Sequence, residues 1–282
     1  MNTSDLHLSC VVPVYNSAPN LKAFVNLLIK ELSEKNFSFE VVLVDDKSED
    51  NSTETIYELI TEHKNIIKRV FLARHKGQHY ATLAGINAAA GDFIITIDDD
   101  GQYQPSYIDN LLKATESLPQ SVIFGIPIKK TGVSKTRKFF SNMAYYFMVL
   151  ITQRKNRYSS FRCIPRYIGR KILNSSFNYV NIEQIIRKIN IQTHSIQVTH
   201  SPGLNKKSRY NMRKLISFVF LSILTYTWYF ETVFLLSAFV ILLFSFIAFK
   251  PSVFVFLSIV FIFLFILLVF LKNKLRMPVK FH

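Results

Sequence analysis

The chain has 282 residues and carries 34 lysines and arginines against 19 acids, a formal charge of +15. This length predicts one or two domains, and the two widely separated cysteines argue against a metal-binding cysteine cluster or a disulfide framework. Seventeen of the acids lie in residues 1–116 with only ten basic residues, so the remainder is strongly basic. The acidic part suits a metal ion, and the basic part predicts an anionic partner: nucleic acid, lipid headgroups or a phosphorylated lipid.

Apolar runs and helical periodicity alternate over the first hundred residues. They predict strands over 8–16, 39–44, 70–72 and 93–97 and helices over 21–32, 52–63 and 78–90. Asn20 is the predicted N-cap of the first helix, and Gly91 is predicted to close the third. The alternation predicts an α/β domain with a mostly parallel sheet. The chain lacks a Gly-x-Gly-x-x-Gly after the first strand and a Walker loop, which argues against dinucleotide binding and ATP hydrolysis.

Chemically distinctive residues lie at the carboxyl ends of three of the predicted strands. They are Pro13 and Tyr15, then Asp45 and Asp46, then the run 98–100. In open parallel sheets, ligands bind at these ends, so we expect the three segments to converge on one crevice. An alternative for Asp45 and Asp46 is that they cap the following helix, because helix N-termini attract acids.

The run 98–100 consists of three consecutive carboxylates, Asp98, Asp99 and Asp100, followed by Gly101 and Gln102. Neighbouring carboxylates repel one another, and a desolvated carboxylate must be paired. A divalent cation would relieve both problems. Oxygen ligands of this kind suit Mg²⁺ or Mn²⁺, which commonly hold substrate phosphates. The triplet therefore predicts phosphate-ester chemistry.

Two uncharged apolar runs, 232–249 and 252–271, lie near the C-terminus and are separated by Lys250-Pro251. Each has the length of a transmembrane helix; a pair of buried helices is the alternative. The tail, 272–282, carries four basic residues, and the positive-inside rule places it with the N-terminal domain in the cytoplasm. Such a membrane hairpin argues against a nucleic-acid partner, and residues 1–7 contain no apolar signal-peptide core.

The segment 211–231 has a different character. It has a basic start, an apolar body and the aromatic pair Trp228-Tyr229, which predicts a helix lying in the membrane interface. A third span ending at Glu231 is the competing interpretation. The predicted organisation is thus a cytoplasmic domain over 1–210, the interfacial segment, two transmembrane helices and the basic tail.

Five segments resemble, in order and spacing, the inverting glycosyltransferases of family 2. They are Val-Val-Pro-Val-Tyr-Asn (11–16), Val-Asp-Asp-Lys-Ser-Glu-Asp (44–50), Arg-His-Lys-Gly (74–77), Ala-Ala-Ala-Gly-Asp (88–92) and Asp-Asp-Asp-Gly-Gln (98–102). This resemblance implies the nucleotide-binding GT-A fold. The later chain resembles the polyprenyl-phosphate subgroup, such as dolichol-phosphate mannose synthases and undecaprenyl-phosphate sugar transferases. The Ser-Lys-Tyr signature of that subgroup appears here as Ser208-Arg209-Tyr210.

The resemblance also implies roles for the matching residues. The nucleotide sugar would contact Pro13, Tyr15, Asp45, Asp46, Asp98 and, through its backbone, Asp99. A Mg²⁺ or Mn²⁺ ion would be held by Asp98, Asp100 and Gln102. The catalytic residues would be Asp98, Asp100 and Arg137.

The acceptor side follows from the same resemblance. The acceptor phosphate would contact Arg137, Ser141, Arg162 and Arg209. The chain departs from the subgroup pattern at Pro127, Gly203 and Lys206, which leaves the identity of the acceptor open. Glu183 is the only acid in a long basic region, so we expect it to pair with a neighbouring cation.

The implied activity is inverting, metal-dependent sugar transfer from a UDP- or GDP-linked donor to a polyprenyl phosphate at the cytoplasmic face of a bacterial inner membrane. A phosphate acceptor is already ionised and needs no general base. Residues 117–182, with twelve basic residues and no acid, suit such an acceptor. The alternatives are a family 2 enzyme that extends a lipid-linked saccharide or a cell-surface polysaccharide, which would need a base, and a non-catalytic scaffold. Membrane lipids are further expected partners; the sugar and the formation of a homo-oligomer stay open.

Overall fold

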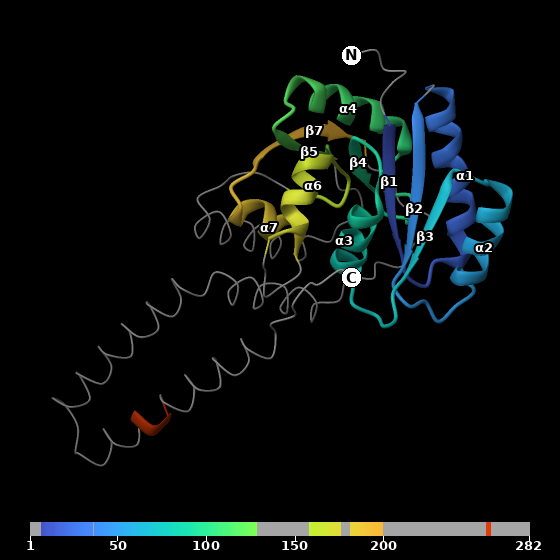
Figure 1. Ribbon diagram of the computed structural model, residues 1–282, viewed down its shortest axis with the longest axis horizontal. Coiled ribbons are helices and arrows are strands. Elements are labelled where there is room, and N and C mark those ends of the chain that lie inside the picture. The colour runs from blue at the N-terminus through green and yellow to red at the C-terminus, as the bar shows by residue number, and fades with distance from the viewer. Residues whose placement is uncertain (1–6, 36, 129–157, 176–180, 200–257, 261–282) are drawn as a thin grey trace. The chain divides into compact units, whose positions relative to one another are not determined.

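A mixed β-sheet forms the centre of the first of two compact units into which the chain divides. The computed structural model describes residues 7–35, 37–128, 158–175, 181–199 and 258–260 (Figure 1). All of these except 258–260 belong to the first unit. The strands are β1 (His7–Val14), β2 (Ser38–Asp45), β3 (Ile67–Phe71), β4 (Phe93–Thr96), β5 (Ser121–Pro127), β6 (Arg162–Pro165) and β7 (Gln192–Val198). The helices are α1 (Ala18–Glu34), α2 (Ser52–Glu62), α3 (Gln78–Ala88), the 3₁₀ helix η2 (Pro105–Tyr107), α4 (Ile108–Ser117), α6 (Arg166–Leu173) and α7 (Ile182–Lys188).

The strand order is β3-β2-β1-β4-β6-β5-β7. Strands β3, β2, β1 and β4 are mutually parallel, because each is reached through a helix that returns the chain to the same edge. Strand β6 runs antiparallel to both of its neighbours, β4 and β5, and β5 pairs in parallel with β7. The predicted α/β class with a mostly parallel sheet is confirmed.

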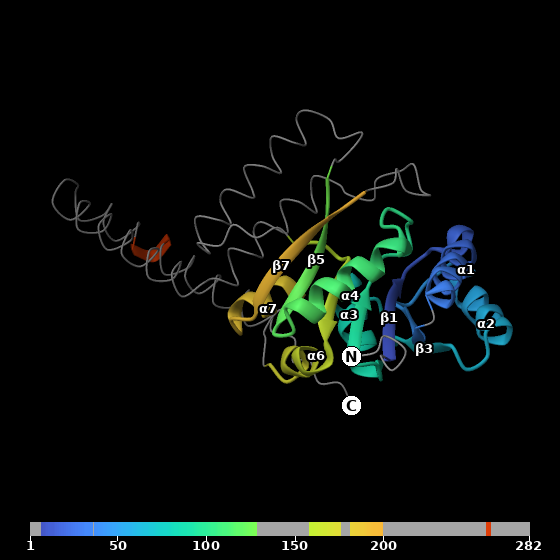
Figure 2. The same cartoon turned by 90° about the horizontal axis from the view of Figure 1, so that it is seen from above.

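Helices cover both faces of this sheet (Figure 2). Helices α1, α2 and α4 pack on one face and α3 and α6 on the other. Alternation along β1 explains both layers, because successive side chains point to opposite faces. Cys10, Val12 and Val14 join the buried core beside α1, whereas Val11 lies close to Gly85 of α3. Burial raises the pKa of the Cys10 thiol, so Cys10 acts as a small buried residue.

Two predicted helix boundaries are wrong. Helix α1 begins at Ala18 with Ser17 in the N-cap position, so Asn20 lies inside the helix. Pro19 occupies the first turn, where its missing N–H needs no partner. Helix α3 ends at Ala88, and its C-cap residue Ala89 is extended, so Gly91 does not close it.

Gly91 is instead required by its close approach to β1. A Cβ on Gly91 would lie 2.6 Å from the backbone nitrogen of Ser9 and 2.7 Å from the carbonyl oxygen of His7. We therefore expect Gly91→Ala to lower the free energy of unfolding by about 1–3 kcal/mol, because strand backbone cannot move aside. Gly169→Ala is the matched control: its Cβ would meet only the side-chain ends of two isoleucines, at 3.1 and 3.2 Å. Equal losses in thermal denaturation of the two variants would contradict this explanation.

The predicted membrane segments at 211–231, 232–249, 252–271 and 272–282 lie outside the described residues, apart from 258–260. Within the described part of the chain, no helix combines the length and apolar character needed to cross a bilayer.

Candidate active site

The sheet order places the three predicted site segments next to one another. Strand β1 lies between β2 and β4, and all three run in the same direction. The amide of Asp46 donates to the carbonyl of Val14 at 2.9 Å, and the amide of Ile97 donates to the carbonyl of Val11 at 3.1 Å. The carboxyl ends carrying residues 13–16, 45–50 and 98–102 therefore adjoin, as the sequence predicts. Pro13 is buried within β1 and Tyr15 is half-buried just beyond it.

Asp45 fastens the loop that follows β2. Its carboxylate is buried and accepts hydrogen bonds from the amide of Ser48 at 2.8 Å and from the hydroxyl of Thr53 at 2.6 Å. Thr53 belongs to the first turn of α2, whose N-cap position is taken by Asn51. Asp45 thus ties the loop to the start of the helix without occupying the cap itself.

Asp46 holds a second loop, between β3 and α3. Its Oδ1 accepts a hydrogen bond from the amide of Lys76 at 2.8 Å, and its Oδ2 accepts one from the amide of Gly77 at 2.7 Å. Oδ2 also lies 2.8 Å from Nδ1 of His75. His75 stacks on Tyr15, with ring centroids 4.1 Å apart and planes 28° from parallel. Asp46 therefore acts on the site through this loop, which places a flat aromatic pair at the end of β1. Such a pair can pack against a nucleotide base.

The first acid of the triplet, Asp98, is held from two sides. The hydroxyl of Ser160 donates to Oδ2 at 2.6 Å, and the side-chain amide of Gln78 donates to Oδ1 at 2.5 Å. Burial raises the pKa of Asp98 to about 7, with further upward contributions from Asp100 and Asp99, although the Ser160 hydrogen bond opposes them. A cation near this cluster would favour its charged form.

The other members of the triplet sit in a tight turn. Gly101 has φ +69°, a left-handed conformation that favours glycine. The amide of Gln102 donates to Oδ1 of Asp100 at 3.0 Å, and Asp99 is buried. In the described ranges, no three His, Cys, Asp or Glu side chains are grouped to hold a metal by themselves. Two carboxylates and an amide fit a Mg²⁺ or Mn²⁺ ion that takes its remaining ligands from substrate phosphates and water.

Arg162 lies at the start of β6 and is almost entirely buried, with 2% of its surface exposed. Its Nη1 is 3.0 Å from Oε1 of Glu183, and its Nε donates to the hydroxyl of Thr96 at 3.1 Å. The expected cationic partner of Glu183 is therefore Arg162. Burial pushes the pKa of Glu183 upward, but Arg162 and His79 outweigh it and hold this pKa below its usual range.

The remaining predicted acceptor residues, Arg137, Ser141 and Arg209, lie outside the described residues. The structure thus brings together the donor half of the predicted site and connects Arg162 to Asp98 through Thr96 and Ser160.

Residues 9–177 match the sequence pattern of glycosyl transferase family 2. The chain belongs to this family. A curated relative, the undecaprenyl-phosphate 4-deoxy-4-formamido-L-arabinose transferase of Proteus mirabilis (strain HI4320), is 30% identical over 221 residues. That alignment covers 76% of this chain and 65% of the relative, so the chain spans just under two thirds of the relative's length.

Solved structures with a similar fold have much lower sequence identity. Glucosyl-3-phosphoglycerate synthase from Mycobacterium tuberculosis, in complex with Mn²⁺ and UDP-glucose, has a TM-score of 0.58 at 13% identity and 79% coverage of both chains. A mannosyltransferase from Pyrobaculum calidifontis, in complex with GDP-Man and Mn²⁺, has a TM-score of 0.56 at 16% identity, covering 78% of this chain and 62% of that one. These likenesses show that this family 2 chain has the GT-A fold.

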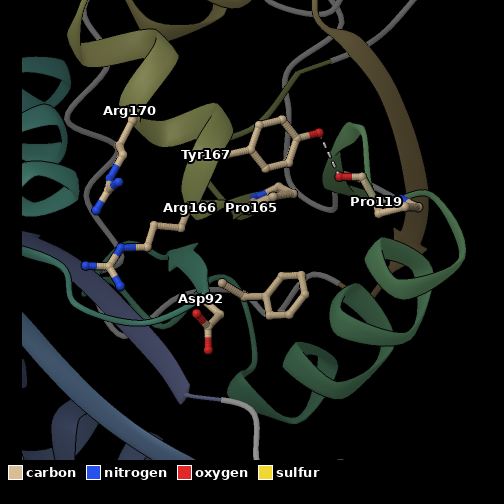
Figure 3. Close-up of a pocket in the computed structure, with 7 residues that line it drawn as sticks. Asp92, Pro119, Pro165, Arg166, Tyr167 and Arg170 are labelled. Carbon is tan, nitrogen blue, oxygen red and sulfur yellow. Dashed lines mark hydrogen bonds between the residues drawn. The ribbon is translucent and has the colours of Figure 1, made fainter. Parts of the chain in front are cut away.

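A cavity of about 440 Å³ has none of the acid triplet in its lining. Figure 3 shows the residues that line it. Asp92 and Phe93, at the start of β4, line it together with Arg166, Tyr167 and Arg170 of α6. The hydroxyl of Tyr167 donates to the carbonyl of Pro119 at 3.0 Å across one side. Because the acid triplet follows the opposite end of β4, this cavity is not part of the candidate active site.

Several residues that contact Asp98 or its partner Ser160 carry no signal in the sequence. Gln78, Thr96 and Ser160 are ordinary polar residues without a distinctive spacing, and only the fold brings Ser160 to Asp98. His75 was a better candidate, because it lies in the Arg-His-Lys-Gly segment. Its stacking on Tyr15 depends on the adjacency of β1 and the loop held by Asp46.

Proposed function

We propose that this chain transfers a sugar from a nucleotide sugar to a polyprenyl phosphate, with inversion at the anomeric carbon. The observation that carries the proposal is the acid triplet 98–100 at the carboxyl end of β4, beside the end of β1, which in turn adjoins the end of β2. Membership of glycosyl transferase family 2 supports sugar transfer. The name of the Proteus relative supports undecaprenyl phosphate as the acceptor class.

The donor half of this site is assigned to the described residues. The Tyr15–His75 pair would pack on the base, and the loops that Asp45 and Asp46 hold would frame the ribose. Asp98 and Asp100, with Gln102, would hold a Mg²⁺ or Mn²⁺ ion. When bound, this ion would neutralise the negative charge that develops on the departing nucleoside diphosphate.

The acceptor half is assigned to cations. A lipid phosphate is ionised at neutral pH, so the enzyme needs to orient it and offset its charge rather than deprotonate it. Arg137, Ser141 and Arg209 would contact the phosphate through charge-assisted hydrogen bonds. Arg162 would contribute its positive charge from a buried position, where it pairs with Glu183 and donates from Nε to Thr96.

The membrane arrangement is part of the same proposal. The runs 232–249 and 252–271 would cross a bacterial inner membrane, with 211–231 in the interface and the catalytic domain in the cytoplasm. This places the acceptor side where an undecaprenyl phosphate headgroup is available, and basic residues there also attract anionic lipids.

A panel of labelled nucleotide sugars, incubated with membranes containing the full chain, tests the proposal. We expect label in an organic-soluble product for one UDP- or GDP-linked donor, dependent on added undecaprenyl phosphate and on Mg²⁺ or Mn²⁺. Label that enters only a pre-formed lipid-linked saccharide, irrespective of added undecaprenyl phosphate, would instead support saccharide extension. Donor binding without product from any acceptor would support a scaffold.

Arg137→Ala tests the acceptor assignment. We expect the KM for undecaprenyl phosphate to rise about tenfold, since a charge-assisted contact contributes about 1.5–3 kcal/mol, while the Kd of the nucleotide sugar stays nearly constant. Lys64→Ala, at an exposed position in the turn after α2, is the charge-matched control and should change neither value. Equal loss of donor and acceptor binding in Arg137→Ala would indicate a structural role for this arginine.

A further inference from the structure

Asp98 is supported by residues from two distant parts of the chain. Ser160 lies two residues before the first residue of β6, and its hydroxyl donates to Oδ2 of Asp98 at 2.6 Å. Gln78, at the start of α3, donates to the other carboxylate oxygen at 2.5 Å. Both oxygens therefore have a fixed partner, so the orientation of the carboxylate depends on where these two partners sit.

Ser160 is in turn fixed by Thr96, the last residue of β4. The Thr96 hydroxyl donates to the carbonyl of Ser160 and accepts a hydrogen bond from Nε of Arg162 at 3.1 Å. Thr96 is 2% exposed and Arg162 is equally buried, so water does not compete for these contacts. The buried hydroxyl of Thr96 therefore links the backbone of Ser160, a partner of Asp98, to the guanidinium of Arg162.

Glu183 connects Arg162 of β6 with His79 of α3. One of its oxygens lies 3.0 Å from Nη1 of Arg162, and the other lies 3.6 Å from Nδ1 of His79. His79 immediately follows Gln78 on α3, so the series of contacts that starts at Asp98 returns to Gln78, the other partner of Asp98. We call this set the support network, which consists of Asp98, Ser160, Thr96, Arg162, Glu183, His79 and Gln78.

A buried ion pair of this kind is a poor way to gain stability alone. Desolvating Arg162 and Glu183 costs about as much as their attraction returns, and apolar residues of similar volume often serve as well. The network reaches Asp98 at both carboxylate oxygens, through Ser160 at Oδ2 and through Gln78 at Oδ1. The presence of the buried ion pair is explained if it fixes the orientation of this carboxylate. Fixed ligands of metals and phosphates depend on such outer partners.

We propose that Thr96, Arg162 and Glu183 are positioning residues, which hold the Asp98 carboxylate in the geometry that binds the divalent cation and the donor diphosphate. The inference rests on the proposed function, because it takes Asp98 as a ligand of that ion. It predicts that disturbing the network weakens metal binding even where the fold is kept.

The test uses Thr96→Val, which removes the linking hydroxyl at nearly constant volume. Thr115→Val is the matched control, because Thr115 is a fully buried threonine on α4 outside the support network, whose hydroxyl donates to the carbonyl of Leu111 at 2.7 Å and also contacts the thiol of Cys163. Mn²⁺ alone is titrated into the purified full chain and followed by electron paramagnetic resonance, with thermal denaturation in parallel. We expect the Mn²⁺ Kd to rise roughly tenfold in Thr96→Val and to stay unchanged in Thr115→Val.

Glu183→Gln is a second variant, which keeps the shape of the network but weakens its ion pair, and we expect the same direction of change. A lowered melting temperature with unchanged Mn²⁺ affinity in both variants would show that the network is only structural and would overturn the inference. The wild-type titration separates this outcome from failure of the proposed function. If the wild-type chain does not bind Mn²⁺, the metal assignment itself falls.

Discussion

Asp100→Asn is expected to reduce sugar transfer at least about a hundredfold, while the chain still folds and inserts into membranes. The substitution removes one of the two carboxylates assigned to the divalent cation, and this cation offsets charge on the leaving diphosphate. The carbonyl oxygen of the new Asn side chain can take the place of Asp100 Oδ1 and accept the hydrogen bond from the amide of Gln102, so the turn can persist. The measurement is initial rate with the established donor at saturating Mn²⁺, together with the melting temperature.

Asp109→Asn is the matched control for this substitution. Asp109 lies in the first turn of α4 and forms surface ion pairs with Lys113 at 2.8 Å and Lys35 at 3.9 Å. Exposed pairs of this kind contribute about 0–1 kcal/mol, so the control should transfer sugar at the wild-type rate. Wild-type rates in Asp100→Asn would remove the metal site from the account.

Arg162→Met is expected to lower the stability of the catalytic domain by about 3–5 kcal/mol. Glu183 would keep its charge in a buried position without the guanidinium 3.0 Å away, and Thr96 would lose its donor. Breaking a buried ion pair on one side is costly because the remaining charge is uncompensated. Chemical or thermal unfolding in detergent, followed by a probe of the catalytic domain, measures the effect.

The double variant Arg162→Met with Glu183→Gln separates charge from packing. Removing the stranded charge should recover a large part of the lost stability, because a neutral pair of similar volume avoids most of the desolvation penalty. If the double variant is as unstable as the sum of both single variants, the loss arises from packing around β6. Transfer activity should stay low in the double variant, since the support network of Asp98 is still broken.

Strands β1, β2 and β4 could be predicted closely from the sequence because they are continuous apolar runs. The edge strand β3 was predicted too short, over 70–72 instead of Ile67–Phe71. Its exposed residues Lys68 and Arg69 interrupt the apolar run, since an edge strand can present charges to solvent. Neither the local pattern nor the composition encodes which strand lies at the edge.

The acids of the site could be predicted because parallel strands present their carboxyl ends on one edge of the sheet. Their partners could not, since they depend on β6, a strand of four residues inserted between β4 and β5. This insertion brings Ser160 and Arg162 to Asp98 and Thr96 across more than sixty residues of chain. The structure adds that Arg162 is a buried partner of Glu183, whereas its contact with the acceptor phosphate stays a prediction.

The most direct test of the account is transfer by the purified full chain, reconstituted in vesicles with undecaprenyl phosphate, Mn²⁺ and a panel of labelled UDP- and GDP-sugars. We expect a single labelled undecaprenyl-phosphate sugar of inverted anomeric configuration, formed only when the donor, the metal and the lipid phosphate are all present. Nucleotide sugars that remain intact with undecaprenyl phosphate, while label enters an acceptor with a free sugar hydroxyl, would contradict it.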